Sequence, residues 1–356
     1  MNPEILYQWT EQIREGLGVE KRQAKRLAVF SYGVVWSERC TLSKVSEKVA
    51  GLLGVRMESI ERRLQRTLGD KKLQSKRVQD AWVKWVLRSV DSRTLVILVD
   101  ETKLGPHLNV MMVGLAYEGR CIPLSWVCYP SRTPGQVQRI ERLLRRIKAA
   151  VPRGYRVIVE ADRGIGTSPD LVRAVRRLGW TYLFRVQGQT KLITRDGHEH
   201  ALQDQPTGWS AYGTLFKQRG RVRGYALVYR EFGQKEAWHL ITNDASLSVH
   251  DYARRNWQEQ SFKDLKSGGW NWQQSHVWQP DHAQVLLLVL ALAYAWILSL
   301  GTLIAHADKP IRARITRSSR RWYSVFREGL RYWLDLTFSA NPVCPGLFFA
   351  PDKLLT

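Results

Sequence analysis

Acidic residues are scarce in this sequence relative to basic ones. Its 356 residues include 32 Asp and Glu against 55 Lys and Arg, which gives a formal net charge of +23. A balance this basic points to a polyanionic partner, either nucleic acid or an anionic membrane surface. The 15 tryptophans are also notable, because aromatic rings can stack on bases, although most of them are expected in the core.

Cysteine is scarce as well, and its spacing excludes two kinds of site. A disulfide framework is not expected at this length, and no CxxC pair or zinc-ligand spacing is formed by Cys40, Cys121, Cys128 and Cys344. Residues 1–18 contain no apolar signal-peptide run, and the sequence has no internal repeat or low-complexity tract. We therefore expect a globular protein of two or three domains in a reducing cytoplasm.

One long apolar run conflicts with that expectation. Residues 285–305 are uncharged and mostly apolar, long enough to span a bilayer, and a basic segment follows them. The same pattern is typical of a fully buried helix in the core of a large domain. The run alone does not separate these two structures.

Residues 1–90 are predicted to form a basic, helical, DNA-binding domain. Two short periodic segments meet at Gly54, a pattern typical of a helix-turn-helix. The first segment has on one face Val45, Val49, Leu52 and Leu53. The second has Ile60, Leu64 and Leu68 on one face and offers outward Arg62, Arg63 and Arg66. A plain helical bundle with a solvated arginine face is the alternative.

The pattern changes to strands after residue 90. Residues 91–187 contain, in order, three strand-like runs, a helix, a strand, a helix and a strand, which predicts a mixed α/β sheet. Residues 188–245 alternate in character around an Asp196-Gly197 turn, so we expect an antiparallel β insertion there. The helical pattern resumes over 246–308, and a basic tail occupies 309–356.

Two of the predicted buried strands end in acids. Asp100 closes the run LVILVD, and Asp162 follows VIVEA. An ionised acid there is costly unless a cation neutralises it, and ligands bind at the carboxyl ends of strands in open α/β sheets. A helix N-cap or a salt bridge is the simpler explanation for either aspartate alone. A third carboxylate would complete a site for two divalent cations.

Glu259 is the candidate for that third carboxylate. On a helix, Tyr252, Arg255, Glu259, Phe262 and Lys266 fall within an arc of roughly 80°. One acid then shares a face with a phenol, a guanidinium group and an ammonium group. An ion pair between Arg255 and Glu259 would explain two of these residues, but not the presence of Tyr252 and Lys266 on the same face.

These motifs resemble those of the DDE transposases. Asp100, Asp162 and Glu259 resemble the three carboxylates of that family's ribonuclease H-like core. The pattern Y-x2-R-x3-E-x6-K, present from Tyr252 to Lys266, is the signature of the insertion-sequence-four family of bacterial transposases. The segment ADRGIG is similar to that family's second-aspartate motif.

The resemblance implies a fold, a reaction and partners. The fold would be a ribonuclease H-like mixed sheet with a β insertion, preceded by a helical DNA-binding domain. The three carboxylates would hold two Mg²⁺ ions, which Mn²⁺ could replace. Hydrolysis at insertion-sequence ends would free a 3′-OH, which joins target DNA. The partners would be terminal inverted repeats and target DNA, bound by a homodimer at the bacterial nucleoid.

The resemblance also implies which residues contact DNA. Near the cleaved phosphodiester these would be Tyr252, Arg255, Lys266 and Arg163. Cleavage could proceed through a hairpin or by direct double-strand cutting. In a hairpin route, a flipped base would stack on an aromatic side chain of the β insertion, for which Trp238 and Trp209 are candidates.

Four further polar residues allow more than one interpretation. Glu160 precedes the second aspartate by two residues, so it lies on the same strand face and could be a ligand or a bystander. Glu101 adjoins the first aspartate but points to the opposite face. His198 and His200 could bind a metal, although a surface pair is the simpler interpretation without a third ligand.

The predicted site favours one interpretation of residues 285–305. They follow the glutamate helix in the same domain, and a bilayer span would pull the site apart. We therefore expect a buried helix packed on the sheet, with no membrane partner. A catalytically inactive DNA-binding protein derived from a transposase is the competing function. The tail at 309–356 could carry DNA or dimer contacts, or be a solvated end.

Overall fold

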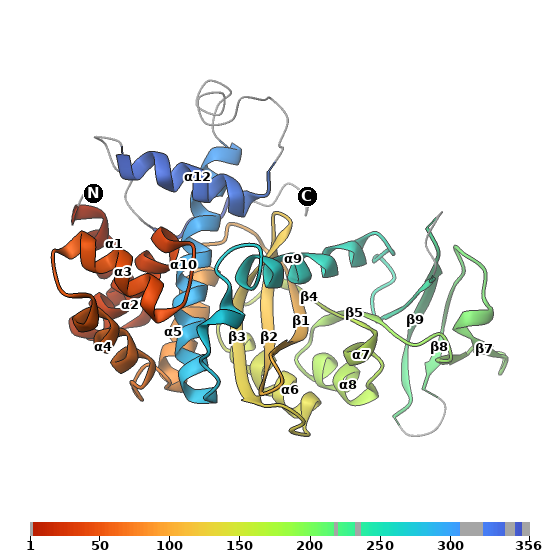
Figure 1. Cartoon of the computed structure of the whole chain (residues 1–356). Coiled ribbons are helices and arrows are strands. Elements are labelled where there is room, and N and C mark those ends of the chain that lie inside the picture. Colours follow the sequence, from red (N-terminus) through yellow and green to blue (C-terminus); the bar gives the residue numbers. More distant parts are fainter. Residues whose placement is uncertain (1–2, 217–219, 232–235, 307–322, 339–345, 351–356) are drawn as a thin grey trace.

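A ten-stranded mixed sheet runs through the computed structural model of the chain, which describes residues 3–216, 220–231, 236–306, 323–338 and 346–350. The strand order is β3-β2-β1-β4-β5-β10-β9-β8-β6-β7. Helices from the N-terminal part of the chain gather beside β3, and the strands up to β7 extend the sheet on the other side (Figure 1).

Five helices precede the first strand: α1 (Pro3–Leu17), α2 (Lys21–Ser37), α3 (Leu42–Leu53), α4 (Met57–Leu68) and α5 (Lys76–Arg88). Helices α2, α3 and α4 pack on one another, and Gly54 ends α3 in the left-handed region at φ 62°, which permits the sharp turn into α4. Leu53 was wrongly predicted on the buried face, since it is 39% exposed. It lies about 80° around the helix from Val45 and so falls at the margin of that face.

The central strands and helices follow the predicted order. They are β1 (Thr94–Leu104), β2 (Leu108–Tyr117), β3 (Arg120–Pro130), α6 (Gln136–Lys148), β4 (Arg156–Ala161), α7 (Arg163–Gly166), α8 (Pro169–Arg177) and β5 (Thr181–Arg185). Strand β1 pairs antiparallel with β2 and parallel with β4, and β4 pairs parallel with β5. The predicted mixed α/β class is confirmed, and this order is consistent with a ribonuclease H-like core. The short helix α7 was not predicted.

The strands of the predicted β insertion continue the same sheet. They are β6 (Lys191–Ile193), β7 (Glu199–Ala201), β8 (Ser210–Leu215), β9 (Val222–Tyr229) and β10 (Trp238–Thr242), with a 3-10 turn η1 (Leu202–Asp204). All pair antiparallel, and β10 joins this group to β5 of the core. The Asp196-Gly197 hairpin turn is confirmed between β6 and β7, with Gly197 at φ 86°.

The C-terminal helices begin on the face of the sheet that carries the acids. They are η2 (Asp251–Arg255), α9 (Asn256–Leu265), η3 (Trp272–Ser275), α10 (Pro280–His306) and α12 (Val325–Phe338). Helix α10 is long and apolar enough to cross a membrane, but 94% of its most apolar window is buried inside the protein. The predicted burial is confirmed. Its main partners are the edge strand β3 and the helices α2 and α12. Residues 309–322, which include most of the basic stretch of the tail, lie outside the described residues, as does Cys344.

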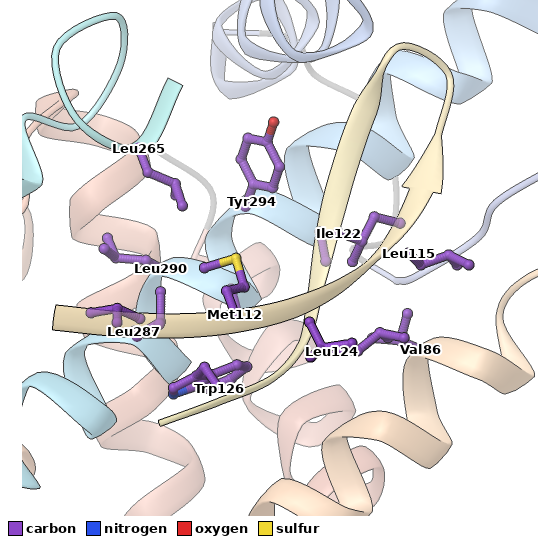
Figure 2. Packing of buried hydrophobic residues seen from close by; sticks show 14 of the residues in the cluster. Val86, Met112, Leu115, Ile122, Leu124, Trp126, Leu265, Leu287, Leu290 and Tyr294 are labelled. Atoms are coloured by element: carbon purple, nitrogen blue, oxygen red, sulfur yellow. The ribbon is translucent and has the colours of Figure 1, made fainter. Parts of the chain in front are cut away.

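A cluster of buried apolar side chains joins α10 to the sheet. Figure 2 shows its members from α5, β2, β3, α9 and α10: Val86, Met112, Leu115, Ile122, Leu124, Trp126, Leu265, Leu287, Leu290 and Tyr294. At its edge, Tyr294 Oη donates to Asp264 Oδ2 at 2.9 Å, and Arg120 Nε lies 2.5 Å from the same oxygen. Asp264 is on α9, so these contacts fix that helix to both α10 and the sheet.

Many of the tryptophans serve packing, as expected from their number. The buried ones are Trp9, Trp82, Trp126, Trp180, Trp270, Trp272, Trp296 and Trp333. The rings of Trp9 and Trp296 stack with centroids 4.9 Å apart, which joins α1 to α10. The N-terminal helices therefore share one aromatic core with the long apolar helix.

Two glycines allow α10 and α12 to pack closely. A Cβ on Gly329 would collide with the carbonyl oxygen of Ile297, and one on Gly301 with that of Val325. We expect Gly329→Ala to lower the free energy of unfolding by about 1–3 kcal/mol in urea denaturation. The control is Gly51→Ala in α3, where a Cβ meets no atom within 4 Å and helix propensity improves. Equal stability of both variants would contradict the close packing.

Candidate active site

The two aspartates lie side by side on one face of the sheet. Strands β1 and β4 are parallel neighbours with Val99 opposite Ala161, so Asp100 and Asp162 follow at the same level. Asp162 comes directly after β4, as predicted. Asp100 was wrongly placed at a strand end, since β1 continues to Leu104 by pairing with β2. The apolar run ends where β1 loses its β4 partner, after Val99.

The Arg255 guanidinium lies among all three carboxylates. Its Nη2 is 2.9 Å from Asp100 Oδ2 and 3.8 Å from Asp162 Oδ2, and its Nη1 is 3.5 Å from Glu259 Oε1. The Arg255 side chain is 6% exposed, whereas that of Glu259 is 57% exposed. The ion pair of Arg255 with Glu259, which was the simpler alternative from the sequence, is present. The sequence pattern did not show that the same arginine reaches both aspartates.

The two aspartates have different surroundings. Burial raises the pKa of Asp100 to about 6, against the opposing effect of Arg255, and the neighbouring acids Asp162 and Glu259 add to the rise. Asp162 is more exposed, and its Oδ1 accepts a hydrogen bond from Ile165 N at 3.0 Å. Asp162 is therefore both the N-cap of α7 and a member of the acidic group, because its second oxygen faces Arg255.

Lys266 is held against β1 beside the acids. It follows α9, and its Nζ donates to Thr102 Oγ1 at 2.5 Å and to the Lys103 carbonyl oxygen at 2.9 Å. Burial lowers the pKa of Lys266, and Asp100 opposes that shift. Thr102 was missed from the sequence. Its spacing of two residues from Asp100, which puts it on the same strand face, was the available signal.

Tyr252 anchors η2 to the end of β4. Its ring is buried, and its Oη donates to the Ala161 carbonyl oxygen at 3.3 Å. The predicted single helix over 252–266 is in two pieces, a 3-10 turn through Arg255 followed by α9. A 3-10 turn at a helix N-terminus is common. The Trp238 ring packs edge-on against Tyr252 with centroids 5.4 Å apart.

The other predicted contact residues are more dispersed. Trp209 lies just before β8 and packs against His200, with ring centroids 5.6 Å apart. Arg163 begins α7 and its Nη1 is 3.1 Å from Glu236 Oε2. The α4 arginines are exposed on a separate surface, where a hollow of about 520 Å³ is lined by Arg56, Glu58, Ser59, Arg62, Arg63 and Arg66.

Two of the ambiguous acids are distinguished by their burial and contacts. Glu101 points to the opposite face, as predicted, and accepts hydrogen bonds from Asn109 and Gln136. Glu160 is fully buried behind the aspartates, with Oε1 3.5 Å from Arg254 Nε. Burial raises the pKa of Glu160 to about 8, against the opposing effect of Arg254. Its depth favours the interpretation of Glu160 as a bystander.

The buried Glu160 predicts a pH-dependent stability. Its folded-state pKa lies above the ordinary value of 4.5, so the folded protein keeps a proton that the unfolded chain releases. Stability should therefore fall as pH rises from about 4.5 to 8. We expect Glu160→Gln to match wild type at pH near 5 and to be more stable by about 1–3 kcal/mol at pH near 9. Urea unfolding at both pH values measures this, with the exposed Glu15→Gln as control. A constant difference would contradict it.

The histidine pair and the acids differ in their surroundings. His198 is exposed beside Asp196, at 3.8 Å, and the ring of His200 packs against Trp209. Within the described ranges, no three His, Cys, Asp or Glu side chains stand close enough together to hold a metal ion as they are. The three carboxylates are instead grouped through their shared contact with Arg255.

Residues 92–296 match a known protein family, described as the transposase DDE domain. The chain belongs to the transposase DDE domain family. The matched region contains both aspartates and Glu259, so the acidic group lies inside the DDE domain. This assignment makes the protein a member of a family of transposition-related nucleases. No curated protein matches the chain.

Some solved structures show a weak likeness to this transposase-family chain. An A. aeolicus Argonaute is 13% identical with a TM-score of 0.23, covering 57% of this chain and 29% of its own. The C-terminal lobe of a budding yeast Argonaute is 12% identical with a TM-score of 0.20, covering 56% and 49%. A Kluyveromyces polysporus Argonaute with a guide RNA is 12% identical with a TM-score of 0.19, covering 60% and 30%. These scores support no conclusion about fold or function.

The donor chemistry of the DDE domain fits hard divalent cations. Carboxylate oxygens are the ligands that Mg²⁺ and Mn²⁺ prefer. Three carboxylates gather around one cationic group here, and two of them, Asp162 and Glu259, are accessible to solvent. The residue types gathered here are therefore those that suit a divalent metal ion.

Proposed function

We propose that the protein is a DNA transposase of the insertion-sequence-four type. It would bind insertion-sequence ends, cleave them by metal-dependent hydrolysis of a phosphodiester, and join the freed 3′-OH to target DNA. The observation that carries this proposal is the convergence of Asp100, Asp162 and Glu259 from β1, β4 and α9 on one cationic group. The family match over the same region supports it.

The three carboxylates would hold two Mg²⁺ ions, or Mn²⁺ in their place. When bound, such ions polarise a phosphodiester oxygen and lower the pKa of an attacking water. Lys266, held by Thr102 beside the acids, is placed to bind the backbone of the DNA end. Tyr252 is predicted from the family signature to contact the DNA backbone, but its buried ring and its bond to the Ala161 carbonyl oxygen favour a positioning role, in which it would hold η2 against the end of β4.

Other parts of the chain would bind the rest of the DNA. The exposed arginines of α4 would contact the terminal repeat, with α3 and α4 as a helix-turn-helix. Arg163 would contact the backbone near the cleaved strand. Trp238, which packs on Tyr252, is the better placed of the two candidate tryptophans for stacking on a flipped base. Two protomers would pair two ends at the bacterial nucleoid in the cytoplasm.

An end-cleavage assay tests the proposal. Purified full-length protein is incubated with Mg²⁺ and a labelled duplex that carries the end of the DNA element encoding it. We expect strand cleavage at the element boundary, and none when EDTA replaces Mg²⁺. Binding without cleavage under every Mg²⁺ or Mn²⁺ condition would favour the alternative, a DNA-binding protein without catalytic activity.

A further inference from the structure

The central position of Arg255 suggests a role beyond binding phosphate. We infer that Arg255 is a placeholder cation that keeps the acids neutralised until DNA arrives. DNA and divalent ions would then displace it together, so that DNA raises the affinity of the acids for the ions. This inference rests on the proposed function, because it concerns the same three carboxylates.

The contacts of Arg255 are those of a substitute counter-ion. One guanidinium group lies within 4 Å of an oxygen of Asp100, Asp162 and Glu259, and it is almost completely buried. An ion held by the same oxygens would be repelled by that positive charge at short range. A divalent ion therefore binds only after Arg255 has moved away. The apparent affinity of the carboxylates for the ion is reduced by the free energy of the contacts that Arg255 loses.

The guanidinium is also incompletely bonded where it lies. Its buried Nε has no hydrogen-bond partner among the described residues. A phosphate of bound DNA offers two adjacent acceptor oxygens, which match the guanidinium fork better than three separated carboxylates do. The DNA backbone can therefore attract Arg255 away from the acids.

The turn that carries Arg255 is held by contacts of the residues that precede it. Tyr252 Oη bonds the Ala161 carbonyl oxygen, and Arg254 lies 3.5 Å from buried Glu160 and 2.8 Å from Asp251. The displacement would therefore be a rotation of the Arg255 side chain, with η2 held in place.

The experiment measures Mn²⁺ binding to the full chain by electron paramagnetic resonance, with and without a duplex that carries the element's end. For wild type we expect DNA to tighten Mn²⁺ binding on the order of tenfold, the usual size of a coupling between sites. For Arg255→Gln we expect Mn²⁺ to bind tightly without DNA, and we expect DNA to raise the Mn²⁺ affinity little further. Arg156→Gln, an exposed arginine that pairs with Asp244, removes the same charge elsewhere and should behave as wild type.

Two results would overturn the inference: equal Mn²⁺ affinity of wild type and Arg255→Gln without DNA, or no effect of saturating DNA on wild type. Arg255→Lys covers the case in which the glutamine variant unfolds. One ammonium group cannot bridge three carboxylates, so its Mn²⁺ affinity without DNA should also exceed that of wild type. The readout is independent of cleavage. If wild type cleaves DNA but DNA does not change its Mn²⁺ affinity, only this inference fails. If DNA tightens Mn²⁺ binding but no cleavage occurs, only the proposed function fails.

Discussion

Glu259→Gln is expected to abolish Mg²⁺-dependent cleavage of the terminal duplex while leaving DNA binding intact. The substitution keeps the shape of the side chain but removes the charge through which Glu259 would hold a divalent ion. Metal-ion catalysis supplies several kcal/mol of transition-state stabilisation, so we expect a rate loss of at least about 10³-fold. Glu259 is largely exposed and contacts Arg255, so the fold should tolerate the change. Single-turnover cleavage of a labelled duplex measures the rate, and fluorescence anisotropy measures binding.

The matched control is Glu101→Gln. Glu101 adjoins Asp100 in β1, but its carboxylate faces the opposite side of the sheet, towards Asn109 and Gln136. It should retain cleavage once the amount of folded protein is matched. If Glu259→Gln cleaves as fast as wild type, the assignment of the third carboxylate is wrong. Equal losses in both variants would indicate a general effect of charge or stability.

The three acids could be predicted because their signals are local. Each signal needs only a few residues of sequence. One apolar run ends at Asp100, another stops before Asp162, and a helical spacing groups Arg255 with Glu259. The structure places all three acids around one guanidinium group. Their roles in catalysis are predictions that the assays above would test.

The contacts that depend on tertiary docking could not be predicted. Arg255 reaches both aspartates because η2 docks at the end of β4, where Tyr252 bonds the Ala161 carbonyl oxygen, and no spacing within η2 encodes that docking. The joining of β10 to β5 is a pairing between distant segments, so the sequence indicated an insertion without showing that it extends the core sheet. The burial of α10 on the sheet was predicted from its place after the glutamate helix, but its packing against α2, α4 and α12 depends on tertiary docking and was not predicted.

The exposed arginines of α4 are expected to supply much of the affinity for DNA. Replacing Arg62, Arg63 and Arg66 together with glutamine should weaken binding of the terminal duplex on the order of 100-fold at moderate salt. All three are exposed, and α4 keeps its buried face of Ile60, Leu64 and Leu68. Each lost phosphate contact should reduce the slope of log affinity against log salt by about 0.9, so the slope should fall by roughly three. Anisotropy titrations at several salt concentrations measure both quantities.

A second triple variant separates a specific surface from overall charge. Replacing Arg142, Arg145 and Lys148 with glutamine removes the same three charges from the exposed side of α6. If α4 holds the DNA, this control should bind close to the wild-type affinity and keep most of the salt slope. If both triple variants weaken DNA binding equally, the high net charge attracts DNA without a preferred helix. That result would contradict the helix-turn-helix interpretation while leaving the acidic site untouched, because α4 and the carboxylates lie on separate surfaces.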